Sequence, residues 1–201
     1  MKFVAFDIET TGTVAGVDRI VELGGVAFEN GQPVGRFSTL VNPMIPIPIG
    51  ASRVNGITDD MVVGQPTIDK VLPDFAEFCG DLPLVAHNSP FDSQFLTSDI
   101  KLFEAPAPRG TVLDTLPVAR KVFPGLLNYK LETLINHLAI EKTHFHRAEA
   151  DAAYCGQLFI KILEKMGGNV GVENILALMG RPEFRFPQII PSPKQLSLLG
   201  L

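Results

Sequence analysis

The feature that most constrains the fold is a run of strand-like segments at the start of the chain. Three segments rich in β-branched and aromatic residues follow one another, at Phe3–Glu9, Ile20–Phe28 and Val34–Val41. The connections between them carry turn residues, including Gly12 and the pair Asn30-Gly31. Because sequential strands joined by short turns usually pair with each other, these segments predict an antiparallel meander.

The chain then alternates between helical and strand-like patterns. Apolar residues recur at helical spacing over Ile68–Cys79, a short strand is expected at Leu82–Ala86, and another helix should begin near Ser89. Further helical patterns cover Leu131–Leu138 and Ala148–Met166. A meander followed by alternating strands and helices predicts an α/β fold with a mixed sheet flanked by helices.

Length and composition favour one globular domain in an aqueous compartment. The 201 residues are 46% hydrophobic and 19% charged, enough to build a sizeable core. No apolar run reaches the roughly 18–20 residues of a membrane span, and no secretory leader precedes the first strand, so we expect a cytoplasmic protein without membrane contact. Cys79 and Cys155 are interpreted as buried thiols, although the sequence also permits a bridge between them.

The net charge of −5 argues against a protein that holds duplex DNA by a broad basic surface. It does not exclude a nuclease, because divalent cations held by carboxylates can meet the phosphate instead. Asp7 and Glu9 are candidates for that role. They lie two residues apart in the first strand, so both project from one face and would repel each other without a cation. An isolated pair of this kind would more often be a polar strand end.

Two further aspartates stand in informative positions. Asp92 would be the third residue of a helix that Ser89 could cap and Pro90 could open, a capping pattern that is compatible with a second role. Asp151 lies within a long helix, five residues after His146. From the residues alone, His144 and His146 are equally plausible participants in chemistry.

Taken together, three motifs resemble those of the DnaQ-like (DEDDh) exonuclease family, in the same order and with similar spacing. They are Phe6–Gly12, His87–Leu96 and His146–Asp151. Weaker similarities at Ile20–Gly24, Asp114–Leu116 and Tyr129–Leu134 extend the resemblance over about residues 1 to 165. The family implies a ribonuclease H-like mixed β-sheet flanked by helices, in agreement with the strand and helix patterns.

The resemblance also implies catalytic roles. Asp7, Glu9 and Asp151 would hold one of two divalent cations, Mg²⁺ or Mn²⁺, and Asp7 would reach the second. Asp92 would act near the metals. His146 matches the histidine that takes a proton from the attacking water, which leaves His144 without a catalytic role.

The same family pattern points to substrate contacts. Thr10, Thr11 and Gly12 match a turn whose backbone approaches the sugar of the terminal nucleotide, where a glycine permits close approach. Phe91 could line the pocket for the base, or it could belong to the core. Asn55 stands where relatives often have a substrate-contacting histidine, and this departure puts that contact in doubt.

By resemblance, the chain is expected to be a 3'-to-5' exonuclease that removes nucleoside monophosphates from DNA 3' ends. It would be of a proofreading or repair type similar to the epsilon subunit of the bacterial replicase, with a DNA polymerase as a partner. One alternative is an RNA-trimming exonuclease of the same fold. Another is a catalytically silent nucleic-acid- or clamp-binding module, against which the presence of all four acids and His146 argues.

We expect an exonuclease domain over residues 1–168 and a C-terminal region over 169–201. That region contains a short helix at Val172–Met179 and a proline-rich extended tail. Near its end, four residues resemble the bacterial motif that docks in the sliding clamp: Gln195, Leu196, Leu198 and Leu199. Leu199 replaces the more typical phenylalanine, and the rival interpretation is that the tail packs back onto the domain.

Overall fold

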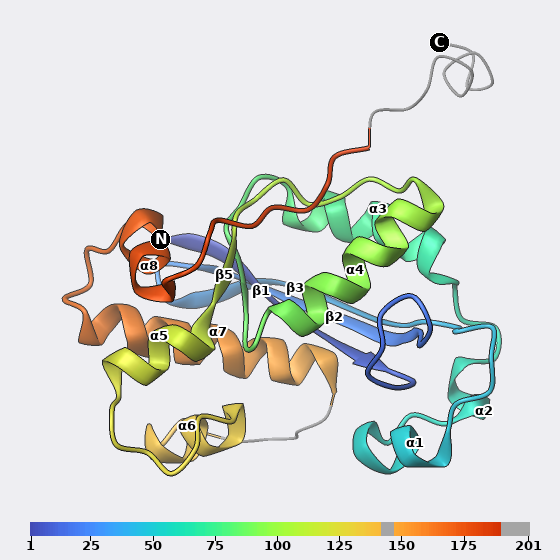
Figure 1. The fold of residues 1–201 in the computed structure, drawn as a ribbon, viewed down its shortest axis with the longest axis horizontal. Helices are drawn as coiled ribbons and strands as arrows, with labels where there is room; N and C mark the ends of the chain where they lie inside the picture. Colours follow the sequence, from blue (N-terminus) through green and yellow to red (C-terminus); the bar gives the residue numbers. More distant parts are fainter. Residues whose placement is uncertain (142–146, 190–201) are drawn as a thin grey trace.

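The computed structural model describes residues 1–141 and 147–189, and it contains the expected mixed sheet flanked by helices (Figure 1). The strand order of this sheet is β3-β2-β1-β4-β5. The meander pairs antiparallel, whereas the later strands run parallel to β1. The strands are β1 (Lys2–Thr10), β2 (Ile20–Glu29), β3 (Gln32–Leu40), β4 (Leu84–Ala86) and β5 (Val112–Asp114).

Helices cover both faces of the sheet and form a three-layer α/β/α arrangement. Side chains alternate along β1, so Phe6 and Ile8 enter one core cluster while Phe3 and Ala5 enter the other. The first cluster packs against α3 (Ile68–Cys79) and α4 (Pro90–Phe103). The second packs against α5 (Thr115–Val122), α6 (Leu131–His137), α7 (Ala148–Lys165) and α8 (Val172–Met179).

Helix α7 lies against β1 and β2 through a tightly packed aromatic group. The rings of Phe3 and Phe28 stack with centroids 5.1 Å apart, and Phe159 of α7 meets Phe3 edge-on at 4.9 Å. Near the start of the helix, a side chain on Gly24 would place its Cβ 2.2 Å from the backbone nitrogen of Glu149. The absence of a side chain at Gly24 therefore allows the first turn of α7 to sit directly on β2.

Four short elements have no counterpart among the expected ones: α1 (Ile49–Asn55), α2 (Asp59–Val62), β5 and α5. Helices α1 and α2 border a small separate cluster made by Val21, Ile47, Ile57 and Val62. These elements span 3 to 8 residues, too short for an apolar repeat to show in the sequence. Both cysteines are buried free thiols, so the thiol interpretation is confirmed.

The segment after α8 is extended, as expected, but up to Ile189 it lies against the domain and is not a free tail. The Val112 amide donates to the Phe184 carbonyl at 2.9 Å, and Phe186 is buried beside Phe6. The clamp-like residues Gln195, Leu196, Leu198 and Leu199 lie outside the described residues. Among the helices of the described chain, none is both long and apolar enough to cross a membrane.

Candidate active site

Three of the expected acids meet where β1 and α7 come together. Asp7 and Glu9 project from the face of β1 that α7 covers, and Asp151 lies in the first turn of α7. One carboxylate oxygen from each residue lies within 4.8 Å of the other two. Carboxylate oxygens are the ligands that Mg²⁺ and similar hard cations prefer, so this donor set fits a divalent cation.

Asp92 reaches the same region from the other face of the sheet. It lies in the first turn of α4, is buried, and its Oδ1 accepts a hydrogen bond from the Ile8 amide at 3.2 Å. Strand β4 pairs with β1 only at Val4 and Ala5, so the β4 side of β1 is open further along the strand. Asp92 is thus attached to the strand that carries Asp7 and Glu9, between those two residues.

The interpretation that Ser89 caps α4 is wrong, whereas Pro90 opens the helix as expected. Ser89 occupies the N-cap position, but its backbone is already helical and its side chain makes no capping hydrogen bond. The Asp92 carboxylate accepts instead from Ile8, which is 84 residues away in the sequence. The first turn of α4 therefore serves a tertiary contact, because it brings the Asp92 carboxylate to β1.

Crowding and burial disfavour ionisation of these acids in the absence of a cation. Burial, followed by repulsion from Asp92, Asp151 and Glu9, raises the pKa of Asp7 well above its usual value. Burial, and then the Asp151 carboxylate, raises the pKa of Glu9 to about 7. Burial also raises the pKa of Asp92 to about 8. A bound divalent cation would reverse this preference by compensating the charges.

Glu22 fixes the beginning of α7. This fully buried residue of β2 lies opposite Glu9 in the register, and its carboxylate accepts from the Arg147 guanidinium at 2.6 and 3.0 Å. Its second oxygen accepts from the Ala148 amide at 2.9 Å, so it also satisfies a free amide at the helix N-terminus. Glu22 therefore holds the turn of helix that carries Asp151.

Thr10, Thr11 and Gly12 form a turn at the end of β1 that is stabilised by hydrogen bonds. The Thr10 hydroxyl donates to the Gly12 carbonyl at 2.5 Å, and the buried Thr11 exchanges backbone and side-chain hydrogen bonds with Arg19. A side chain on Gly12 would place its Cβ 2.4 Å from the Asp18 carboxylate. The Asp18 side chain thus fills the space beside Gly12 and would have to move to admit a larger residue, whether or not a sugar also approaches.

Asn55 and Phe91 lie beside this turn and α4 respectively. Asn55 is 3% exposed; its Nδ2 donates to the Thr10 carbonyl at 3.3 Å and its Oδ1 accepts from the Ile57 amide at 3.0 Å. Phe91 is half-buried against the core, with its ring centroid 5.1 Å from that of Phe95. Substrate contact by either residue stays a prediction.

The structure describes His87 but not the other two candidate histidines. His146, the expected base, and His144 both lie outside the described residues. His87 has a structural position: its ring nitrogens lie 2.8 Å from the Thr115 hydroxyl and 2.8 Å from the Tyr129 carbonyl oxygen. Burial is the main cause that lowers the pKa of His87, so the neutral ring is favoured.

A mixed sheet between two helical layers, with three carboxylates converging across a strand and a helix, fits the class of α/β enzymes that bind a divalent cation through carboxylates. The exonuclease family model (RNase_T) matches residues 4–159, and the chain belongs to this family. Its members use divalent metal ions. The expected fold and the expected exonuclease relationship are both confirmed.

Several DNA polymerase III proteins are similar over most of this chain. It is 41% identical to the DNA polymerase III subunit epsilon of Treponema pallidum, covering 81% of this chain and 77% of that protein. It is 39% identical to that of Aquifex aeolicus, covering 88% and 87%. It is also 42% identical to the PolC-type DNA polymerase III of Caldanaerobacter subterraneus, over 87% of this chain but only 12% of the polymerase.

Solved structures share the fold. Exonuclease X in complex with 5' overhanging duplex DNA superposes with a TM-score of 0.74 at 28% identity, covering 89% of this chain and 99% of that one. Exonuclease I superposes with a TM-score of 0.72 at 17% identity, covering 88% of this chain and 45% of that one. At that identity, the second similarity concerns the fold alone.

Proposed function

We propose that the chain is a metal-dependent 3'-to-5' exonuclease that hydrolyses the terminal phosphodiester of a DNA strand and releases a nucleoside monophosphate. The observation that carries this proposal is the convergence of Asp7, Glu9 and Asp151 within 4.8 Å, with Asp92 attached to the same strand. Acids held this close, and largely removed from water, need a positive partner to be ionised together.

The four acids and His146 would have separate roles in the reaction. Asp7, Glu9 and Asp151 would hold one divalent cation, Mg²⁺ or Mn²⁺, with Asp7 reaching a second and Asp92 acting near them. When bound, the cations would stabilise negative charge on the phosphate and favour deprotonation of the attacking water. His146 would accept the proton from that water, which requires the neutral imidazole and therefore favours neutral to alkaline pH.

The remaining residues would orient the substrate. The turn Thr10–Gly12 would receive the sugar of the terminal nucleotide, with Asn55 fixing the Thr10 carbonyl. Phe91, exposed in part on the first turn of α4, would contact the terminal base. Such contacts raise the rate by fixing the scissile bond against the acids, because misplacement by about 1 Å can reduce activity roughly 100-fold.

DNA is favoured over RNA as the substrate by the similar proteins, which include DNA polymerase III subunits and an exonuclease in complex with DNA. The chain spans only 12% of the PolC-type polymerase, so the functions of that whole protein do not transfer to it directly. We therefore include a role in proofreading, and association with a DNA polymerase, as parts of the proposal. RNA trimming is the alternative that the same experiment tests.

The test is digestion of 5'-labelled DNA and RNA strands with paired and mismatched 3' ends, with Mg²⁺, Mn²⁺ or chelator. Wild type should produce a ladder that shortens from the 3' end, and chelator or the Asp7→Ala substitution should abolish it. Asp74→Ala, at an exposed acid on α3, is the matched control and should leave the ladder unchanged. A stronger ladder on RNA would support the trimming enzyme, and no ladder on any substrate would leave only a binding module.

A further inference from the structure

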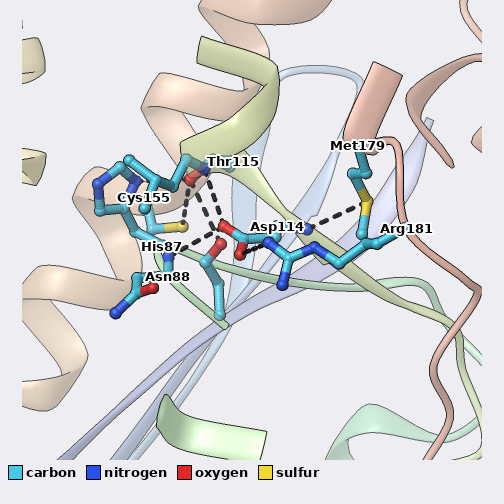
Figure 2. Close-up of polar contacts among 9 residues, drawn as sticks. His87, Asn88, Asp114, Thr115, Cys155, Met179 and Arg181 are labelled. Carbon is cyan, nitrogen blue, oxygen red and sulfur yellow. Dashed lines mark hydrogen bonds and ion pairs between the residues drawn. The ribbon is translucent and has the colours of Figure 1, made fainter. Parts of the chain in front are cut away.

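Asp114, the last residue of β5, is a buried carboxylate with partners from three parts of the chain (Figure 2). Its Oδ1 accepts from the Asn88 amide at 3.0 Å and from the Leu116 amide, at the start of α5, at 2.8 Å. Its Oδ2 pairs with the Nη2 of Arg181, beyond α8. We call this set of contacts the Asp114 junction.

The junction holds the turn that delivers Asp92. Asn88 connects β4 to α4 with φ of 64°, a left-handed conformation that few residues other than glycine adopt. Its carbonyl accepts from the Phe91 amide at 3.1 Å, so its orientation fixes the first turn of α4. Asp92 lies in that turn. Releasing the Asn88 amide would therefore free the backbone that aims Asp92 at β1.

A second chain of contacts leads from the junction to α7. The Thr115 hydroxyl lies 2.8 Å from His87 Nδ1 and donates to the Ala86 carbonyl at 3.3 Å. It also lies 3.9 Å from the thiol sulfur of Cys155, one helical turn beyond Asp151. Through these packed polar groups, both Asp92 on α4 and Asp151 on α7 lie a short distance from the end of β5.

Arg181 supplies the positive charge of the junction from outside the segment that the family model matches. It lies past residue 159, where the match to the family model ends. The segment that carries it is fastened to the domain independently of the ion pair. The Thr111 hydroxyl donates to the Glu183 carboxylate at 2.6 Å, and the side-chain Nε2 of Gln188 donates to the Pro108 carbonyl at 3.2 Å.

The charge of Asp114 explains why Arg181 matters. The Asp114 side chain is 0% exposed, and an ionised carboxylate in that position is unfavourable without a counter-ion. With Arg181 removed, the carboxylate must take up a proton, admit water or turn towards solvent and away from Asn88. Each of these changes weakens the hydrogen bond that sustains the left-handed turn.

We propose that Arg181 is a positioning residue for the exonuclease reaction, because it neutralises Asp114, which in turn holds the Asn88 turn and Asp92. The kinetic part of the inference rests on the proposed function, whereas the structural part rests on the contacts alone. The segment after α8 then helps to position Asp92 and is not only a connection to the tail.

The test compares Arg181→Ala, Arg181→Lys and a control in the same segment, Arg185→Ala, whose partner Glu183 is exposed. Steady-state digestion should show at least a tenfold lower kcat for Arg181→Ala with KM within about twofold, because geometry and not binding is disturbed. Arg181→Lys should recover at least half of the lost rate. Arg185→Ala should match wild type.

Two further readouts separate positioning from a general loss of stability. Amide exchange at Asn88, followed by NMR, should be at least tenfold faster in Arg181→Ala and unchanged in Arg185→Ala. In an Asp114→Asn background, which keeps the acceptor oxygen but removes the charge, Arg181→Ala should change kcat by less than twofold. Should Arg181→Ala fail to fold, Arg181→Gln replaces it, with the same expected contrast to Arg181→Lys.

Wild-type kcat and wild-type exchange at Asn88 in Arg181→Ala would overturn the proposal. So would a lower Tm without change in either quantity, since that is the signature of a merely structural contact. An effect of Arg181→Ala that is equally large in the Asp114→Asn background would also overturn it. Inactivity of the wild type would contradict the proposed exonuclease function instead, while the exchange measurement would still test the junction.

Discussion

At the scale of single residues, Asn55 is a buried polar residue beside the turn Thr10–Gly12, which we propose receives the sugar of the terminal nucleotide. Its buried amide joins α1 to the last residue of β1 through the Thr10 carbonyl and also accepts from the Ile57 amide. A direct contact with nucleic acid would have to compete with these bonds. We therefore expect Asn55 to act by holding the turn Thr10–Gly12.

Asn55→Ala should raise KM several-fold with a smaller effect on kcat, because the turn proposed to receive the sugar loses its support. The loss of buried hydrogen bonds should lower the free energy of unfolding by about 1–3 kcal/mol. Steady-state digestion and denaturant titration measure both effects. Asn42→Ala, which removes only a local bond to the Met44 amide, is the control and should leave KM unchanged. An unaltered KM in Asn55→Ala would refute this role.

At the scale of elements, the contact between α7 and β2 sets where Asp151 lies. Glu22 ties the helix start to the strand, and Gly24 allows the backbones to approach. Gly24→Ala would place its Cβ 2.2 Å from the Glu149 nitrogen, so α7 must move. We expect a loss of about 1–3 kcal/mol in the free energy of unfolding, as for other overpacked sites, together with weaker Mg²⁺-dependent cleavage.

Gly35→Ala is a matched control for this substitution. It lies on β3, and its added Cβ would meet its nearest neighbour, the Phe78 ring, at 3.5 Å, an ordinary contact. Denaturant titration and the Mg²⁺ concentration at half-maximal rate should be close to wild type for Gly35→Ala. If Gly24→Ala also left both unchanged, the close approach would not be what positions Asp151.

At the scale of the whole molecule, the crowded acids link stability to pH and metal. The pKa of Glu9 is raised to about 7 and that of Asp92 to about 8, so the folded protein binds these protons more tightly than the unfolded chain. The stability contributed by these protons is fully present below about pH 4 and is lost as pH rises through 7 to 8. The Tm of metal-free protein should therefore decrease from pH 5 to pH 8.

Saturating Mg²⁺ should counter this decrease. A cation at 100 times its Kd adds about 2.7 kcal/mol, which is about 5–10 °C in Tm for a domain of this size. Differential scanning calorimetry with and without chelator measures the shift. In Glu9→Gln both the pH-dependent decrease and the Mg²⁺ response should be smaller. A Tm that is independent of Mg²⁺ at pH 8 would contradict the metal assignment.

The division between domain and tail leads to a further prediction. Residues up to Ile189 are attached to the domain, so a chain ending there should digest free DNA strands at the wild-type rate. A labelled peptide of residues 190–201, titrated against a bacterial sliding clamp, tests the motif at Gln195–Leu199. No binding at high micromolar concentration would remove the clamp hypothesis, and slower digestion by the shortened chain would support packing of the tail on the domain.

The amino-acid sequence by itself determined the local features. The alternation of Phe6, Asp7, Ile8 and Glu9 placed two acids on one face of a strand. The 3.6-residue spacing over Ile68–Cys79 and Ala148–Met166 predicted all of α3 and all of α7, the latter with one residue too many. Such features depend on neighbours within one turn or one strand. The family pattern of the three motifs then indicated which acids belong together.

Only the tertiary structure decided the contacts between distant segments. The sequence placed Asp92 in a capping pattern at the start of its own helix, but in the fold its Oδ1 accepts from the Ile8 amide. The sequence left Glu22 without a specific partner, but the fold pairs it with Arg147. The tail pattern gave no sign that Arg181 would pair with the buried Asp114. These outcomes depend on which surfaces meet when the layers pack, and local periodicity carries no information about partners 60 or more residues away.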